Sequence, residues 1–90
     1  MNKIWHDDAW DDFLKLLTTD KKFLKKVNAL IKDIERNGNS GIGKPEPLKG
    51  DLSGYWSRHI DDYNRIVYRI VKDDEKEFIE IVQCGTHYHK

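Results

Sequence analysis

The chain has 90 residues, of which 38% are hydrophobic and 36% are charged, and its formal net charge is zero. This length and composition predict one folded, very polar domain spanning residues 1–90 rather than a disordered chain. No apolar run approaches the roughly 20 residues that cross a bilayer, Met1–Trp10 lacks the apolar stretch of a signal peptide, and Cys84 is alone, so we expect a cytoplasmic protein without disulfides.

The first part of the chain has the pattern of a short strand followed by two helices. Lys3–His6 is apolar at its middle and predicts a strand, after which Asp7 or Asp8 is expected to cap a helix that runs to about Thr18. Asp20 is expected to cap a second helix, and a segment rich in glycine and asparagine ends it. The apolar side chains of this second helix recur with the 3.6-residue period of a surface helix: Phe23, Val27, Leu30, Ile31 and Ile34.

After Gly43 the pattern changes to the alternation that is typical of strands. Extended segments are predicted at Glu46–Lys49, Tyr55–Ile60, Arg65–Val71 and Glu77–Cys84. Their connections are short, so these strands should form an antiparallel sheet. The sequence therefore predicts an α+β fold in which a hairpin of two N-terminal helices packs on an antiparallel sheet.

Several side chains are candidates for chemistry, although each also has a plainer interpretation. Glu46 lies between two prolines, which hold its backbone extended, but it could be an ordinary loop carboxylate. Arg58 and Arg65 offer the forked guanidinium group that suits phosphate, but strand arginines commonly pair with surface carboxylates. His87 and His89 can change charge near neutral pH, but histidines near a chain end are commonly solvated or bind metal adventitiously.

Glutamate, arginine and histidine together suit the cleavage of RNA without a metal ion. A carboxylate can remove the proton of the 2′-hydroxyl, a histidine can protonate the leaving 5′-oxygen, and an arginine can stabilise the added negative charge. The chain has no paired Cys and His spacing for zinc and no complete phosphate-binding glycine loop, so we expect neither a metal nor a cofactor.

The charges are unevenly distributed along the chain. Residues 21–69 hold eleven Lys and Arg against six Asp and Glu, whereas the segments on either side are acidic. A basic patch of this kind favours a polyanionic partner. The alternative is that these lysines only solvate a helix face.

Four blocks of sequence, in this order and at this spacing, resemble the YoeB/Txe toxins of the RelE-like mRNA interferase group. They are Gly-Lys-Pro-Glu-Pro-Leu-Lys at 43–49, Leu-Ser-Gly-Tyr-Trp-Ser-Arg at 52–58, Arg-Ile-Val-Tyr at 65–68 and His-Tyr at 87–88. The resemblance extends over essentially the whole chain. It implies a RelE-like fold, with the two helices against a curved antiparallel sheet.

The resemblance also implies a function and a set of site residues. The implied function is that of a type II toxin that cuts mRNA in the ribosomal A site, leaving a 2′,3′-cyclic phosphate and a 5′-hydroxyl. Glu46 is similar to the general base of the family and His87 to its general acid. Arg65 corresponds to the residue that stabilises the transition state, and Tyr88 to the tyrosine that helps to place the substrate.

RNA-contacting basic positions are expected at Lys49 and Arg58, with Lys44 and His59 beside them. His59 stands where the family often has a second arginine, and Gly85-Thr86 precede His87 where the tail commonly carries arginine and tyrosine. Both departures remove positive charge near the RNA.

The partners implied by the resemblance are the ribosome with its mRNA and an antitoxin of the YefM or Axe type, whose flexible C-terminal segment covers the toxin site. A homodimer is also implied, contact with operator DNA is expected only through the antitoxin complex, and no membrane partner is expected. The alternative function is a non-catalytic RNA- or protein-binding module on the same scaffold. Glu46 and His87 favour the enzyme, although His89 could substitute for His87 as the acid.

Overall fold

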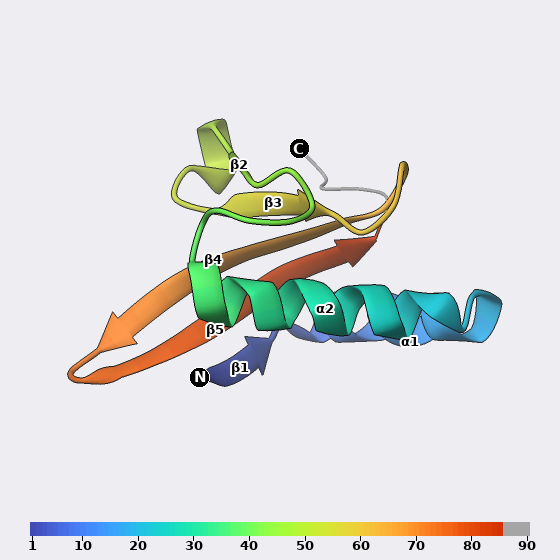
Figure 1. The fold of residues 1–90 in the computed structure, drawn as a ribbon, viewed down its shortest axis with the longest axis horizontal. Helices are drawn as coiled ribbons and strands as arrows, with labels where there is room; N and C mark the ends of the chain where they lie inside the picture. The colour runs from blue at the N-terminus through green and yellow to red at the C-terminus, as the bar shows by residue number, and fades with distance from the viewer. Residues whose placement is uncertain (86–90) are drawn as a thin grey trace.

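The computed structural model describes residues 1–85 (Figure 1). The elements follow in this order: β1 (Asn2–Trp5), α1 (Asp7–Thr19), α2 (Lys22–Asn37), β2 (Glu46–Pro47), a short 3-10 helix (Gly50–Leu52), β3 (Trp56–His59), β4 (Arg65–Asp73) and β5 (Lys76–Gly85). The predicted α+β fold, with a hairpin of two helices against a sheet, is confirmed. In Figure 1 both helices run across one side of the sheet, and the β4–β5 hairpin extends beyond them.

The sheet has the strand order β1-β5-β4-β3-β2. The pairs β2–β3, β3–β4 and β4–β5 are antiparallel, as predicted for the strands after Gly43. Strand β1 adds a parallel pair at the outer edge of β5. The two helices follow β1 in the chain and form the long connection that lies between it and the other strands. The sheet is therefore mostly, rather than entirely, antiparallel.

A bulge interrupts the pairing of β4 with β5. Val67 lies opposite Gln83 but Tyr68 lies opposite Ile81, so Val82 is an extra residue on β5. An extra residue reverses the side to which the following side chains point. For this reason Ile81 and Cys84, three positions apart, both belong to the core under the helices.

The core lies between the helices and one face of the sheet. It contains Phe13 of α1, Phe23 and Ile34 of α2, and a set of strand residues that are fully buried: Ile66, Tyr68, Ile79, Ile81 and Cys84. The rings of Phe13 and Phe23 lie 6.1 Å apart and join the two helices. Cys84 is fully buried in this core, and burial raises the pKa of its thiol to about 12.

The helix starts differ in part from the prediction. Helix α1 begins after His6, whose backbone is extended and whose side chain makes no capping hydrogen bond. The prediction that Asp7 or Asp8 caps this helix is therefore wrong, and both lie in its first turn, where a negative charge favours the helix dipole. At α2 the capping position is Lys21 rather than the predicted Asp20, but the Asp20 carboxylate accepts a hydrogen bond of 2.9 Å from the backbone amide of Lys22, the first residue of the helix. Within residues 1–85, no helix has the length and apolar character needed to cross a membrane.

Candidate functional site

The sheet face opposite the helices, here called the open face, carries three of the predicted site residues. Glu46 lies opposite Ser57 in the β2–β3 pair, and His59 lies opposite Arg65 in the β3–β4 pair. Directly opposed residues in an antiparallel sheet share a face, and so do residues two apart in one strand. Ser57 and His59 are two apart, so Glu46, His59 and Arg65 all belong to the open face.

Glu46 is exposed and opens the two-residue strand β2 at the edge of the sheet. Two backbone hydrogen bonds extend the attachment of this edge beyond the strand itself. Before it, the amide of His59 donates to the carbonyl of Gly43 over 2.7 Å, and after it, the amide of Leu48 donates to the carbonyl of Tyr55 over 2.9 Å. The carboxylate is thus carried by a backbone that is fixed on both sides.

His59 is half-buried and is surrounded by the charged candidates. Burial lowers the pKa of His59, and the positive charges of Arg65 and Lys44 lower it further, while Glu46 and Asp62 oppose this shift. His59 is therefore predominantly neutral near pH 7. Because the charges of Lys44, Glu46 and Arg65 all shift the pKa of His59, these three side chains surround the same ring.

Arg65 begins β4 and is anchored through one nitrogen. Its Nη1 donates to the carbonyl oxygens of Asp61, Asp62 and Asn64 over 3.2, 3.3 and 3.2 Å. The turn that supplies these carbonyls is held by the Asp61 carboxylate, which accepts from the amides of Tyr63 and Asn64 over 2.9 and 2.7 Å. All the side-chain hydrogen bonds that Arg65 forms with residues 1–85 use Nη1, so within this part of the chain no partner occupies Nε and Nη2, a pair of donors that suits an anion.

Arg58 corrects one sequence-based expectation. Its side chain is 0% exposed, and it lies under the helices rather than on the open face. It forms an ion pair with Asp33 of α2, and its Nε donates to the Tyr68 hydroxyl over 3.1 Å. The expectation that Arg58 contacts RNA is therefore wrong, because its guanidinium group is enclosed by protein. Strand alternation contained this information, since Arg58 shares its face with Trp56 and Ile60.

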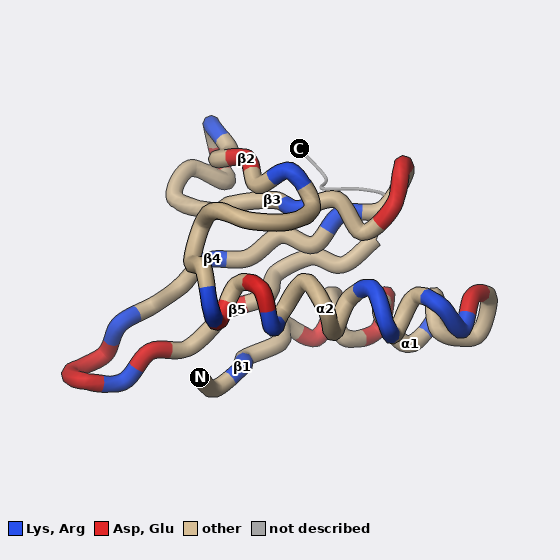
Figure 2. The backbone as a smooth tube through the Cα atoms, in the orientation of Figure 1, with Lys and Arg blue, Asp and Glu red and all other residues tan. Residues whose placement is uncertain are grey.

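The remaining predicted residues lie in two places. Lys44 and Lys49 are exposed on either side of β2, where Figure 2 shows basic and acidic segments close together. Lys44 has a positive φ of 52°. His87 and Tyr88 lie outside the described residues, and the last described residue, Gly85, is the register partner of Arg65.

A second charged group on the open face was not identified from the sequence as a site. Arg69 pairs with Glu80 directly across from it, and its guanidinium lies 5.1 Å from the centre of the Tyr55 ring. Glu80 also accepts from Nε2 of His6 over 2.6 Å. This is the pairing of a strand arginine with a carboxylate that is common on sheet surfaces, so Arg69 is less available than Arg65 for a ligand.

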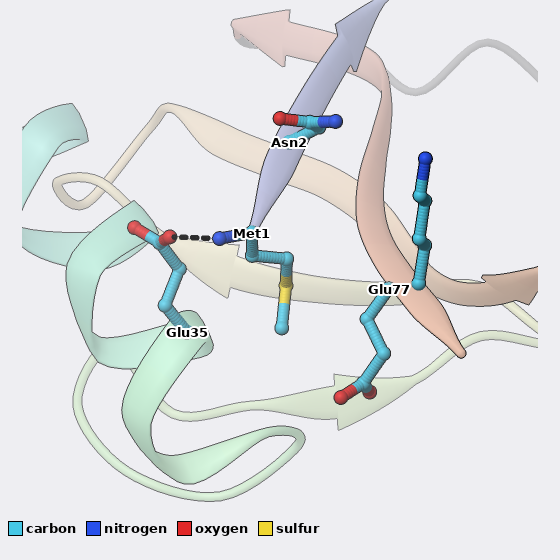
Figure 3. Close-up of a pocket in the computed structure, with 5 residues that line it drawn as sticks. Met1, Asn2, Glu35 and Glu77 are labelled. Atoms are coloured by element: carbon cyan, nitrogen blue, oxygen red, sulfur yellow. Dashed lines mark ion pairs between the residues drawn. The ribbon is translucent and has the colours of Figure 1, made fainter.

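The structure also contains a surface hollow of about 430 Å³ that lies apart from these residues (Figure 3). It is lined by Met1, Asn2, Glu35, Lys76 and Glu77. The N-terminal ammonium group lies 3.4 Å from the Glu35 carboxylate. None of the candidate residues lines this hollow, and residues 1–85 contain no group of three His, Cys, Asp or Glu side chains arranged to hold a metal ion.

The sequence matches a known family over residues 5–88, the YoeB-like toxin of bacterial type II toxin-antitoxin systems. The chain is 47% identical to Toxin YoeB of Escherichia coli K12 over 88 residues, which cover 98% of this chain and all of that protein. It is 52% identical to Toxin RelK of Mycobacterium tuberculosis over 81 residues, which cover 90% of this chain and 91% of the relative.

Solved structures show the same architecture. The YoeB/ParE toxin from Agrobacterium tumefaciens superposes with a TM-score of 0.91 at 42% identity, covering 98% of this chain and 100% of that one. A chain of the heterotetrameric YoeB-YefM toxin-antitoxin complex from Staphylococcus aureus gives 0.84 at 44% identity, covering 98% of each. The YoeB dimer from the same species gives 0.83 at 43% identity, with the same coverage.

Together the fold, the open face and these matches define the class of protein: it is a toxin of a bacterial type II toxin-antitoxin system. Within that class, the chain belongs to the YoeB-like toxin family. The RelE-like fold that the sequence motifs implied is confirmed.

Proposed function

We propose that this toxin is a ribosome-dependent endoribonuclease that cuts mRNA in the A site without a metal ion. The observation that carries the proposal is the convergence of Glu46 and Arg65 on the open face, around the neutral ring of His59. A carboxylate and a guanidinium on one exposed surface supply a base and a phosphate-binding group for attack by a 2′-hydroxyl.

In the proposed reaction, Glu46 accepts the proton of the 2′-hydroxyl as the 2′-oxygen attacks the adjacent phosphorus. The bond from phosphorus to the 5′-oxygen breaks, and His87 donates a proton to that leaving oxygen. Arg65 stabilises the negative charge that builds up on the phosphoryl oxygens through the donors of its guanidinium group. The products are a 2′,3′-cyclic phosphate and a 5′-hydroxyl, and Tyr88 helps to place the substrate.

Chain length supports the assignment of His87 as the acid. Gly85 is the register partner of Arg65, and His87 follows it by two residues. Two residues span at most about 7 Å, so the Cα atom of His87 cannot be farther than this from that of Gly85. His89 follows Gly85 by four residues, so chain length restricts its place less, and it is the second choice for the acid.

The exposed lysines on either side of β2 supply the proposed contacts to the RNA backbone. Lys44 and Lys49 place positive charge next to Glu46, and His59 offers a neutral donor or acceptor in place of the family's common arginine. Arg58 is left out of this set because it is buried.

The chemistry of the cleavage products tests the proposal. A ribosome programmed with a defined mRNA is treated with the toxin, and the downstream fragment is labelled with polynucleotide kinase with and without prior phosphatase treatment. We expect equal labelling in both cases, because the fragment carries a 5′-hydroxyl. Labelling that requires phosphatase would indicate a 5′-phosphate and would exclude this mechanism.

The matched variants for this assay are Glu46→Gln and Glu75→Gln, which remove one exposed carboxylate from the site and one from the β4–β5 turn. Removal of a general base costs about 10²–10⁴-fold in rate, so Glu46→Gln should lose most cleavage while Glu75→Gln retains it. A non-catalytic binding module on this scaffold would instead block translation equally well with either variant and would release no fragments.

We also propose that the toxin is held inactive by an antitoxin of the YefM type and that it forms a homodimer in the cytoplasm. The support is that solved structures of YoeB relatives from Staphylococcus aureus, 43–44% identical to this chain, include a YoeB-YefM complex and a YoeB dimer. Operator DNA would be bound only through the antitoxin complex. Light scattering over a hundredfold dilution tests the dimer, and a constant monomer mass would exclude it.

A further inference from the structure

The segment between α2 and β2 leads directly to Lys44 and Glu46 but forms no regular secondary structure. Its backbone is unusual, because Gly38, Gly41, Gly43 and Lys44 have positive φ values of 66°, 127°, 79° and 52°. Such a path lacks the hydrogen-bond ladder of a helix or strand, so other groups must fix it. Its position matters because only Pro45 separates Lys44 from the strand that begins at Glu46.

Arg58 supplies the missing hydrogen-bond donors. Its guanidinium donates to three alternate carbonyl oxygens of this segment, over 2.6 Å to Gly38, 3.0 Å to Ser40 and 3.1 Å to Ile42. The segment therefore curls around one buried cation. Because the Arg58 side chain is completely buried, each of these bonds would be costly to leave unmade.

Asp33 closes the same structure from α2. Its carboxylate forms the ion pair with Arg58, accepts from the amide of Ile42 over 3.0 Å, and accepts from Nδ2 of Asn37 over 2.7 Å. The charge and hydrogen bond of Arg58 lower the pKa of Asp33, so this carboxylate is ionised at neutral pH. The segment is thus held between a cation on β3 and an anion on α2.

This arrangement is connected to the open face through very few residues. Arg58 precedes His59, whose amide donates to the carbonyl of Gly43. A side chain at Gly43 would meet Leu30 at 2.7 Å and the carbonyl of His59 at 3.0 Å, so the chain passes closely between α2 and β3 there. Only Lys44 and Pro45 separate Gly43 from Glu46, so a displacement of Gly43 would also displace the backbone of Glu46.

We propose that Arg58 and Asp33, joined beneath the sheet, are positioning residues that fix the 38–43 segment and so set the place of Lys44 and Glu46 on the open face. The proposal rests on the proposed function of Glu46. A buried ion pair contributes little net stability compared with apolar residues of similar size, so stability alone does not explain its presence. What it supplies is one defined path for an irregular segment, and a misplacement of about 1 Å at a reacting group can cost about 10²-fold in rate.

The test compares Asp33→Leu, Asp33→Asn and Ile79→Val in mRNA cleavage on programmed ribosomes. Asp33→Leu removes the partner of the Arg58 cation and should lower kcat by about 10²-fold, with KM changed less than twofold because the exposed lysines remain. Asp33→Asn keeps an oxygen that can accept from Arg58 and Ile42, so it should recover most of kcat. Ile79→Val lowers stability through the core alone and should leave kcat at the parent value when all proteins are folded.

A double variant covers the case in which Asp33→Leu leaves an unpaired buried cation and fails to fold. Asp33→Leu combined with Arg58→Met replaces the pair with apolar side chains, which retains the core but removes the donors to the segment. It should be folded and should show the same loss of kcat. Parent-level kcat in this double variant, or a loss of kcat in Ile79→Val equal to that of Asp33→Leu at the same melting temperature, would overturn the proposal.

Hydrogen exchange separates this proposal from the proposed function. The amides of Ile42 and His59 should exchange faster in the double variant, whereas the amide of Ile79 in the central strand pair should not. If Glu46→Gln keeps full activity, the assigned base is wrong, and the exchange rates still decide whether the pair fixes the segment. Unchanged exchange at Ile42 and His59 in a folded double variant would refute the positioning role.

Discussion

The two faces of the sheet treat charge in opposite ways. On the face under the helices, the buried cation of Arg58 is matched by Asp33, three backbone carbonyls and the Tyr68 hydroxyl. On the open face, the side chain of Arg65 uses one nitrogen for its hydrogen bonds with residues 1–85, and burial together with the charges of Arg65 and Lys44 lowers the pKa of His59. The comparison teaches that a fully satisfied charge serves the fold, whereas a partly satisfied charge remains available for a ligand.

The two faces are represented by neighbouring residues of β3, one of which points under the helices and the other to the open face. Arg58 and His59 are neighbours in β3, and successive side chains of a strand point to opposite faces. Both were expected to contact RNA, but only the side chain of His59 is on the open face. By the same alternation, a shift of one residue in β3 would exchange the side chain that is buried under the helices with the one on the open face.

The largest effect that would test this comparison is expected at the histidines of the tail. Replacement of the proton donor should lower the rate of cleavage by about 10²–10⁴-fold, so His87→Ala should abolish growth inhibition. His89→Ala is the matched control and should remain toxic. The measurements are cleavage on programmed ribosomes and growth after induction, with circular dichroism to show that both variants fold. A toxic His87→Ala together with an inactive His89→Ala would move the acid to residue 89.

A somewhat smaller effect is expected for Arg65→Lys. The lysine keeps the charge but loses the forked donors, and loss of one such electrostatic donor costs roughly 10²–10³-fold in rate. Binding to the ribosome should be nearly intact, because Lys44 and Lys49 still supply positive charge. Pelleting of the toxin with ribosomes measures binding, and single-turnover cleavage measures the rate. Equal losses in both would make Arg65 a docking residue.

The two faces should also differ in their contribution to stability. Ile66→Ala, under the helices, should lower the free energy of unfolding by about 2–5 kcal/mol, because it removes buried methyl groups and leaves a cavity. Arg69→Gln, on the open face, breaks the ion pair with Glu80 but should cost no more than about 1 kcal/mol, because Arg69 is half-exposed. Urea unfolding at pH 7 measures both. Equal costs would mean that charge pairs on the open face stabilise the fold as strongly as the core does.

Much of the fold could be predicted because it follows from local patterns. The 3.6-residue repeat in α2 and the alternation after Gly43 reflect which side chains face the core, and both are visible in the sequence. The parallel pairing of β1 with β5 and the bulge at Val82 could not be predicted, since both depend on contacts between residues far apart in the chain. The local sequence of a strand does not show which other strand it pairs with.

The site was predicted less evenly for a related reason. Glu46 could be chosen as a candidate because its two prolines and its motif mark it directly, and the register places it on the same face as Arg65. Arg58 was misassigned because an arginine in the sequence suggests phosphate binding whether its side chain is exposed on the open face or buried under the helices. Its partner Asp33 lies 25 positions away, on a helix whose polar side chains otherwise face solvent, so nothing in the local sequence links the two.

The smallest expected effect concerns the pH dependence of stability at His59. Burial and the charges of Arg65 and Lys44 lower the pKa of this side chain below its usual value near 6.5. Well above pH 6.5 the ring is neutral in both the folded and the unfolded chain and contributes nothing to the pH dependence of stability. As the pH falls below 6.5 the unfolded chain takes up the proton first, so stability decreases until the folded pKa has been passed.

His59→Gln removes this proton uptake, and its stability should therefore fall less than that of the parent between pH 7.5 and pH 5. The lowered pKa values of Asp33, Asp61 and Glu80 act below this window, and the other histidines are common to both proteins, so the difference isolates His59. Urea midpoints at the two pH values measure it. A steeper fall in the variant than in the parent would mean that the folded protein favours the charged ring, and the neutral His59 of the open face would have to be abandoned.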